Sequence, residues 1–293
     1  MKKVKLGIIL GTLMLLAIAV ALGKNYAARQ TAAAPAPGVS AAQAILVDGQ
    51  TGKVLYEKNA DEKAYPASTT KIMTALLVLE TLEEYDSPID QKIAVPKEAV
   101  GVEGSSLYLK EGEKISIQDL LYGLMLRSGN DAAVALSIIA SGDKDLFVQR
   151  MNEKAAELHC KNTHFINPNG LFDENHYTTV RDMSIIAREA MSHKAFRAIV
   201  AAKSWDAGRE ESEFNHFYNK NKTVHQFKGG NGIKIGFTKA SGRTLVASAQ
   251  RDGKEVICVV MGAPNWFDDS YLLLFLQNRI SAMHIKRLSF LQM

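Results

Sequence analysis

Residues 65–74 read YPASTTKIMT and begin an apolar segment that continues to Leu79. Apolar side chains recur in this segment at helical spacing, and Pro66 lies just before the predicted start of the helix. Positions i and i+3 share one face of a helix, so Ser68 and Lys71 can touch. A serine hydroxyl becomes a nucleophile when a base takes its proton, and a lysine can be that base when burial and nearby positive charge lower its pKa. The stretch predicts a nucleophile–base pair, although a serine or threonine before an apolar helix is also an ordinary helix cap.

The segments on either side of this helix indicate an α+β fold. Strand-like runs lie near both ends of the chain, and helical patterns fill the middle. We therefore expect one sheet that pairs the two chain ends, with a helical region inserted between them. The expected strands are 44–48, 53–57, 244–249 and 255–261, with turns at 49–52 and 251–253, and the expected helices are 117–140, 144–158, 179–192 and 271–276.

Two further short motifs carry polar groups suited to catalysis. In Ser128-Gly129-Asn130, the serine can relay a proton and the asparagine can hold a substrate amide. The alternative is a plain turn, because all three residue types favour turns. In Lys234-Ile235-Gly236, a strand presents a positive charge beside a glycine. The alternative there is an exposed lysine on an edge strand.

Taken together, the three motifs resemble the SxxK, SxN and KTG set of penicillin-binding proteins and class A β-lactamases. They occur in that order, with 60 residues from Ser68 to Ser128 and 104 from Asn130 to Lys234. The surrounding words resemble the low-molecular-weight D-alanyl-D-alanine carboxypeptidases, the S11 serine peptidases, and this resemblance covers about residues 42–275. The matching words are those at 65–74, 124–133, 162–171, 176–179 and 245–249.

The resemblance implies a penicillin-recognising fold, in which an antiparallel sheet is flanked by helices with a helical subdomain beside it. It implies an acyl-enzyme on Ser68 with Lys71 as general base, and loss of the terminal D-alanine from peptidoglycan stem peptides. β-Lactam antibiotics would acylate the same serine. The implied site comprises catalytic Ser68, Lys71 and Ser128 and substrate-binding Asn130, Lys234, Gly236 and Thr238.

One motif position departs from the family, because Ile235 stands where the threonine of KTG is expected. Loss of one hydrogen bond to the substrate costs about 0.5–1.5 kcal/mol, so we expect weaker binding rather than loss of activity. A catalytically weak wall-binding or regulatory protein is the alternative from another class, and a cell-wall endopeptidase would use the same residues. A class A β-lactamase would need a glutamate in a separate loop, and no ExxLN segment lies between Asn130 and Lys234.

The N-terminus predicts export. Three lysines precede the uncharged apolar run Ile8–Leu22, which is the pattern of a signal peptide or an uncleaved membrane anchor, with a buried helix as the alternative. We expect a leader at 1–23, an Ala/Pro-rich tether at 24–42, the peptidase domain at 43–276 and a tail at 277–293 that is either frayed or in contact with the membrane surface. The domain would then act outside the cytoplasm, secreted or held at the outer face of the cell membrane.

Composition and charge exclude several other classes. Hydrophobic residues make up 47% and charged residues 23% of the chain, as in ordinary globular proteins, which excludes disordered, collagenous and disulfide-rich chains. A net charge of +4 is too small to predict nucleic acid binding. Cys160 and Cys258 show no CxxC spacing and the histidines form no HExxH motif, so we expect no metal and no cofactor. The two cysteines are interpreted as buried free thiols, with a single disulfide as the alternative.

Overall fold

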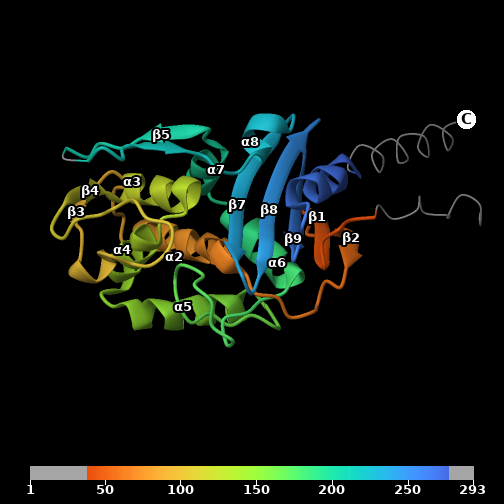
Figure 1. Ribbon diagram of the computed structural model, residues 1–293, viewed down its shortest axis with the longest axis horizontal. Helices are drawn as coiled ribbons and strands as arrows, with labels where there is room; N and C mark the ends of the chain where they lie inside the picture. Colours follow the sequence, from red (N-terminus) through yellow and green to blue (C-terminus); the bar gives the residue numbers. More distant parts are fainter. Residues whose placement is uncertain (1–37, 211, 277–293) are drawn as a thin grey trace, which may run out of the picture. The chain divides into compact units, whose positions relative to one another are not determined.

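A five-stranded antiparallel sheet and a group of helices beside it make up the fold (Figure 1). The computed structural model describes residues 38–210 and 212–276. The strands are β1 (Gln43–Asp48), β2 (Val54–Lys58), β3 (Lys92–Ala94), β4 (Lys114–Ser116), β5 (Ser204–Asp206), β6 (His216–Tyr218), β7 (Gly230–Thr238), β8 (Gly242–Arg251) and β9 (Lys254–Met261). The α-helices are α2 (Lys71–Glu84), α3 (Ile117–Tyr122), α4 (Asn130–Ser141), α5 (Lys144–Glu157), α6 (Val180–Ala190), α7 (Lys194–Ala201) and α8 (Thr223–Gln226).

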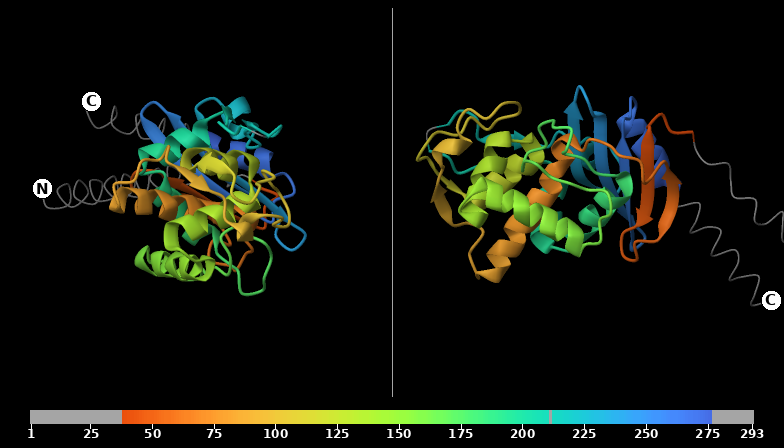
Figure 2. Two further views of the ribbon diagram at one scale, coloured as in Figure 1. Left: turned by 90° about the vertical axis from the view of Figure 1, so that its left-hand side faces the viewer. Right: turned by 90° about the horizontal axis from the view of Figure 1, so that it is seen from below.

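The sheet joins the two ends of the described chain, as the sequence predicts. Its strand order is β2-β1-β9-β8-β7, so β1 pairs with β9 although they are far apart in sequence. The predicted hairpin of β1 and β2 and the predicted hairpin of β8 and β9 are both confirmed. β7 forms one edge of the sheet, and Figure 1 shows this edge on the side of the helical region, which also lies beside the sheet in the right-hand view of Figure 2.

The central strands bury both faces, and successive side chains alternate between two separate apolar layers. In β9, Ile257 and Val259 belong to the layer shared with the helices, whereas Cys258 and Val260 belong to the layer on the opposite face. A helix at residues 266–276 supplies that second layer with Leu273 and Leu274, among others. The helix predicted at 271–276 therefore exists and begins five residues earlier. Because every strand residue must fit one layer or the other, the register of the sheet is well determined.

The helical region differs from the sequence prediction at one place. A single helix was expected over 117–140, but α3 is followed by a π-helical turn (Gly123–Arg127) and α4 begins only at Asn130. Ser128 has a φ of 67°, in the left-handed region that ends a right-handed helix. The hydrophobic pattern continues across this break because both segments pack into the same core, so periodicity alone could not detect it.

Two small two-stranded sheets and two helices were not predicted. β3 pairs with β4 and β5 pairs with β6, each over three residues, which is too short for a period-two pattern to be recognised. The helices α7 and α8, of eight and four residues, were also missed.

The segments at the chain ends are described only in part. The predicted leader at 1–23, most of the predicted tether and the predicted tail at 277–293 lie outside the described residues. Residues 39–42, assigned to the tether above, are bonded to the fold instead: the Asp269 carboxylate accepts from the Ser40 and Ala41 N–H groups at 2.8 and 2.9 Å. Over 38–210 and 212–276, no helix is long and apolar enough to span a membrane. Cys160 and Cys258 are free thiols rather than a disulfide.

Candidate active site

Ser68 lies in a tight 3-10 turn (Ala67–Thr70) that leads directly into α2. Ala67, just before it, has a φ of 49°, an uncommon backbone conformation for a residue with a side chain. The turn is held from two sides. The Pro66 carbonyl accepts from the Thr69 hydroxyl at 2.7 Å and from the Thr244 hydroxyl of β8 at 3.1 Å. Strain of this kind persists only where surrounding contacts enforce it. Here the two hydrogen bonds to the Pro66 carbonyl hold the turn that carries Ser68.

Lys71 is fully buried, and its amine nitrogen has three oxygen partners. Nζ lies 3.1 Å from Ser68 Oγ, 2.7 Å from Asn130 Oδ1 and 2.5 Å from the Asn169 carbonyl oxygen. The contact between Ser68 and Lys71 is the one that the i, i+3 spacing predicts. The contact with Asn130 unites the first and second motifs, which are 59 residues apart in sequence.

These partners suit the neutral amine form of Lys71. The Asn130 and Asn169 oxygens can only accept, so they take the two N–H groups of a neutral amine, and its lone pair then faces the Ser68 hydroxyl, the one partner that can donate. Burial, followed by the nearby positive charge of Lys234, lowers the pKa of Lys71 well below its usual value of 10.5. The carboxylate of Asp131 opposes this shift.

The second motif occupies the junction between the π-helical turn and α4. Both ends of the Asn130 amide are used, because Oδ1 accepts from Lys71 and Nδ2 donates to the Glu103 carbonyl at 2.6 Å. Gly104 has a φ of +94°, and a Cβ there would lie 2.6 Å from Asn130 Nδ2, so the loop approaches the amide closely only because this residue is glycine. The Ser128 hydroxyl is buried and has no hydrogen-bond partner among the described residues. A buried hydroxyl without a partner is costly unless something else, such as a substrate, bonds to it.

The third motif lies on β7, and its three predicted site residues differ in their surroundings. Lys234 is only 1% exposed, so the alternative of an exposed edge-strand lysine is wrong. Its Nζ donates to the Ile235 carbonyl at 3.3 Å, and burial, followed by the charge of Lys220, lowers its pKa to about 7. A Cβ at Gly236 would lie 2.9 Å from the Ser68 nitrogen, so only glycine lets β7 come this close to the nucleophile. The Thr238 hydroxyl bonds to Ser241 at 2.9 Å, inside the turn between β7 and β8.

Ile235 packs on the opposite side of the sheet from this cluster. Its partly buried side chain belongs to the layer that contains Leu245 and the helix at 266–276. Residue 235 therefore contributes to the apolar layer on the face of the sheet away from the helical region, which the motif alone could not indicate.

Two contributors to the site were missed by sequence reasoning. The Asn169 carbonyl is a backbone group, so no residue-type pattern marks it, although its loop 167–171 was noted as part of the family resemblance. Lys220 lowers the pKa values of both Lys71 and Lys234 by its charge, and its own pKa is lowered by burial and by Arg127. The two closely spaced lysines at 220 and 222 were the only sequence feature that could have indicated this charge.

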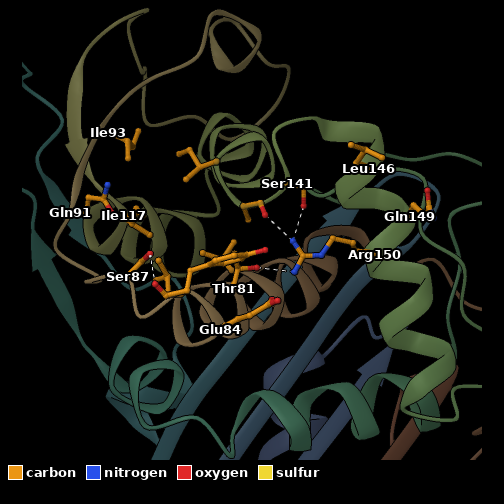
Figure 3. Close-up of a pocket in the computed structure, with 15 residues that line it drawn as sticks. Thr81, Glu84, Ser87, Gln91, Ile93, Ile117, Ser141, Leu146, Gln149 and Arg150 are labelled. Atoms are coloured by element: carbon orange, nitrogen blue, oxygen red, sulfur yellow. Dashed lines mark hydrogen bonds between the residues drawn. The ribbon is translucent and has the colours of Figure 1, made fainter.

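A cavity of about 720 Å³ lies away from this cluster, along the C-terminal half of α2 (Figure 3). Arg150 points into it and donates to the Ser141 hydroxyl at 2.9 Å and the Thr81 hydroxyl at 2.9 Å. The residues that line it include Glu84 but no residue of the three motifs, so the cavity does not bring together the groups that the sequence predicts. The motif cluster, rather than this hollow, is the candidate active site.

Comparisons with known proteins identify the family. The family model described as D-alanyl-D-alanine carboxypeptidase, peptidase S11, matches residues 29–265. The chain is 38% identical over 224 residues to the D-alanyl-D-alanine carboxypeptidase DacF of Bacillus subtilis, a match that covers 76% of this chain and 57% of that protein. It is 36% identical to DacC of Escherichia coli, with 81% and 60% covered. This chain therefore spans less than two thirds of both relatives. The crystal structure of penicillin binding protein 6B from Escherichia coli superposes with a TM-score of 0.77 at 29% identity, covering 84% of this chain and 79% of that one.

Proposed function

The chain belongs to the peptidase S11 family of D-alanyl-D-alanine carboxypeptidases, and on that premise we propose that it removes the terminal D-alanine from peptidoglycan stem peptides through an acyl-enzyme on Ser68. The observation that carries this proposal is the set of partners around Lys71 Nζ. The Asn130 and Asn169 oxygens and the Ser68 hydroxyl all lie within 3.1 Å of it, so a neutral amine that donates to the two oxygens directs its lone pair at the hydroxyl.

Acylation begins when the Ser68 oxygen attacks the carbonyl carbon of the penultimate D-alanine. Lys71, as the neutral amine, takes the hydroxyl proton as the new C–O bond forms. The Ser68 N–H lies where β7 approaches the turn at Gly236, and a backbone N–H at that point can stabilise the oxygen that becomes negatively charged. The C–N bond then breaks, and a proton must reach the departing amine.

Ser128 is suited to deliver that proton because its buried hydroxyl has no other partner among the described residues. A hydroxyl can accept a proton from Lys71 and donate its own to the amine nitrogen, which restores the neutral lysine. Asn130 binds Lys71 and so keeps α4 in register with the nucleophile. Water then attacks the acyl-enzyme, Ser68 regains its proton, and the shortened peptide leaves.

The terminal carboxylate of the substrate is the natural partner for Lys234. The lysine is buried beside a second cation, Lys220, and burial has lowered its pKa to about 7. A bound carboxylate would compensate this charge and raise that pKa, because an opposite charge favours the protonated form of a lysine. The same arrangement would accept the carboxylate of a β-lactam, which would acylate Ser68 as well.

The proposal also covers the peptide bond that is cleaved and the compartment in which the domain acts. A cell-wall endopeptidase would use the same residues on a different peptide bond, and a weak wall-binding protein would retain binding without turnover. We propose that the domain acts outside the cytoplasm, with residues 1–23 as leader or anchor, because its substrate lies there.

Two measurements on the purified protein test this function. A fluorescent penicillin should label the wild-type protein covalently, and a peptide ending in D-alanyl-D-alanine should release free D-alanine. The Ser68→Ala variant should do neither while keeping its thermal unfolding transition. Labelling without release of D-alanine would favour the wall-binding alternative, and no labelling of the wild type would overturn the proposal.

A further inference from the structure

A loop between α5 and α6 carries the Asn169 carbonyl that binds Lys71, and it is fixed to α2 by several bonds. The Thr74 hydroxyl donates to the Pro168 carbonyl at 2.6 Å, one residue before Asn169. The Asn152 amide of α5 holds the start of the loop, accepting from the Phe165 N–H at 2.8 Å and donating to the Phe165 carbonyl at 2.9 Å. The position of the Asn169 oxygen is therefore set by bonds elsewhere in the loop.

His176 joins this loop to the turn of the nucleophile. The side chain is 2% exposed, and its Nδ1 accepts from the Ile166 N–H at 3.0 Å. Its Nε2 lies 2.8 Å from the hydroxyl of Thr70, the residue before Lys71. Since Nδ1 accepts from a backbone N–H, it carries no proton, so the proton is on Nε2 and is donated to Thr70. One neutral imidazole tautomer thus connects the loop backbone to the start of α2.

We propose that His176 is a positioning residue for acylation: by bonding Ile166 and Thr70 at once, it holds the Asn169 carbonyl against Lys71 Nζ and keeps water away from that amine. The proposal rests on the function proposed above and gives a role to a residue outside the three catalytic motifs. It follows from the order of the contacts, because Thr70 ends the 3-10 turn and Lys71 begins α2, while Ile166 and Asn169 lie in the same loop.

Loss of the His176 bonds should act on Lys71 in a specific way. Once the loop loosens, water reaches the amine and stabilises its ammonium form, so the pKa of Lys71 rises. Acylation needs the neutral amine, so its rate would then fall off at a higher pH than in the wild type. A residue that merely stabilises the fold would lower stability without moving this part of the pH profile.

The charges around His176 favour its neutral form at working pH. Burial lowers its pKa to about 4, Asp173 opposes this shift, and His164 and Lys71 add to it. Protonation would place a hydrogen on Nδ1 facing the Ile166 N–H, which breaks the bond. The connection should therefore hold throughout the neutral range and open near pH 4.

Three variants and one control test the proposal, with second-order labelling by a fluorescent penicillin measured from pH 4 to 9. His176→Phe keeps a ring of similar size and removes both bonds, whereas His176→Gln retains an acceptor and a donor at similar spacing. Thr70→Val removes only the hydroxyl partner. Ser184→Ala, in α6, is the control, because it also deletes a buried hydroxyl, one that donates to the Arg181 carbonyl at 2.7 Å rather than to His176. Hydrogen exchange of the Ile166 amide is measured in parallel.

We expect His176→Phe and Thr70→Val to acylate about tenfold more slowly or worse, consistent with loss of one or two buried hydrogen bonds. The acid limb of their profiles should move upward by about one pH unit, and the Ile166 amide should exchange faster. His176→Gln should recover labelling to within a few-fold, and Ser184→Ala should match the wild type. If His176→Phe fails to fold, Thr70→Val and His176→Gln still test whether the His176 bonds affect acylation.

Two results would overturn the proposal. One is labelling within twofold of the wild type with an unchanged acid limb in His176→Phe and Thr70→Val. The other is slower labelling with an unmoved acid limb and no recovery in His176→Gln, which would mean a purely structural role. A wild-type protein that is not labelled at all would instead refute the proposed function, and the exchange of the Ile166 amide would then report separately on whether His176 holds the loop.

Discussion

Lys234 leads to a prediction about stability that can be measured without any substrate. Its side chain is 1% exposed, and its pKa of about 7 in the folded protein lies well below the usual lysine value of 10.5. Between these two values the unfolded chain binds more protons at this residue than the folded protein does. The free energy of unfolding must therefore rise as the pH increases from 7 towards 10.

The size of the effect follows from the two pKa values. From pH 7 to 9 the folded lysine goes from half protonated to almost fully neutral, while the unfolded one stays charged. Linkage then gives a gain of about 2 kcal/mol in unfolding free energy from this residue over that interval. Lys71, which is also buried with a lowered pKa, adds a contribution of the same sign.

The assay is urea unfolding at pH 7, 8 and 9 on three proteins. Lys234→Met keeps most of the side-chain volume and cannot titrate, and Lys239→Met removes an exposed lysine five residues along the chain as the matched control. We expect the control to follow the wild type and Lys234→Met to lose about 2 kcal/mol of the rise between pH 7 and 9. Equal pH dependence in the wild type and Lys234→Met would show that Lys234 is not desolvated in the folded protein, and the reasoning would fail.

Three further predictions concern the motif residues. Ser68→Ala should abolish covalent penicillin labelling in a protein that still folds, and mass spectrometry that found the label on Thr69 or Thr70 would contradict the assignment. Lys71→Arg should lose acylation almost as completely as Lys71→Ala, by about 10²–10⁴-fold, because arginine cannot deprotonate at workable pH; a rate within a few-fold of the wild type would mean that charge alone suffices. Ile235→Thr should leave acylation within a few-fold of the wild type, because this side chain packs on the face of the sheet away from the cluster; a rate about tenfold faster with a penicillin or a D-alanyl-D-alanine peptide would show that residue 235 reaches the substrate.

The sheet was predictable because its strands alternate between two apolar layers or lie fully buried. Two short apolar runs are typical of buried strands, and they contain Ile257 and Val259 in one case and Ile45 and Val47 in the other. The break at Ser128 was not predictable in this way, since hydrophobic periodicity continues on both sides of it. Serine also rarely adopts a positive φ, so its residue type gave no warning.

The side chains of the candidate site were easier to foresee than their surroundings. The spacing of Ser68 and Lys71 predicts their contact directly, because it depends on one helical turn. The second acceptor of Lys71 is a carbonyl 98 residues away, and its place depends on the fold of a loop. Backbone groups are the same in every residue, so a sequence cannot mark the ones that a site uses.

The pairing of β1 with β9 sets the time at which the protein becomes able to react. Asp48 and Lys254 are 206 positions apart in the chain, so a ribosome needs about 10 to 40 seconds to make the partner of β1 after β1 itself. Ser68 and Lys71 are made early in that interval, whereas β7, which brings Lys234 beside them, and β8 are made only near its end, and β9 follows last. The nucleophile is thus among the first parts to be synthesised and among the last to be completed. A chain stopped before Lys254 should take up no penicillin. The site would then not react until synthesis of the domain is almost finished.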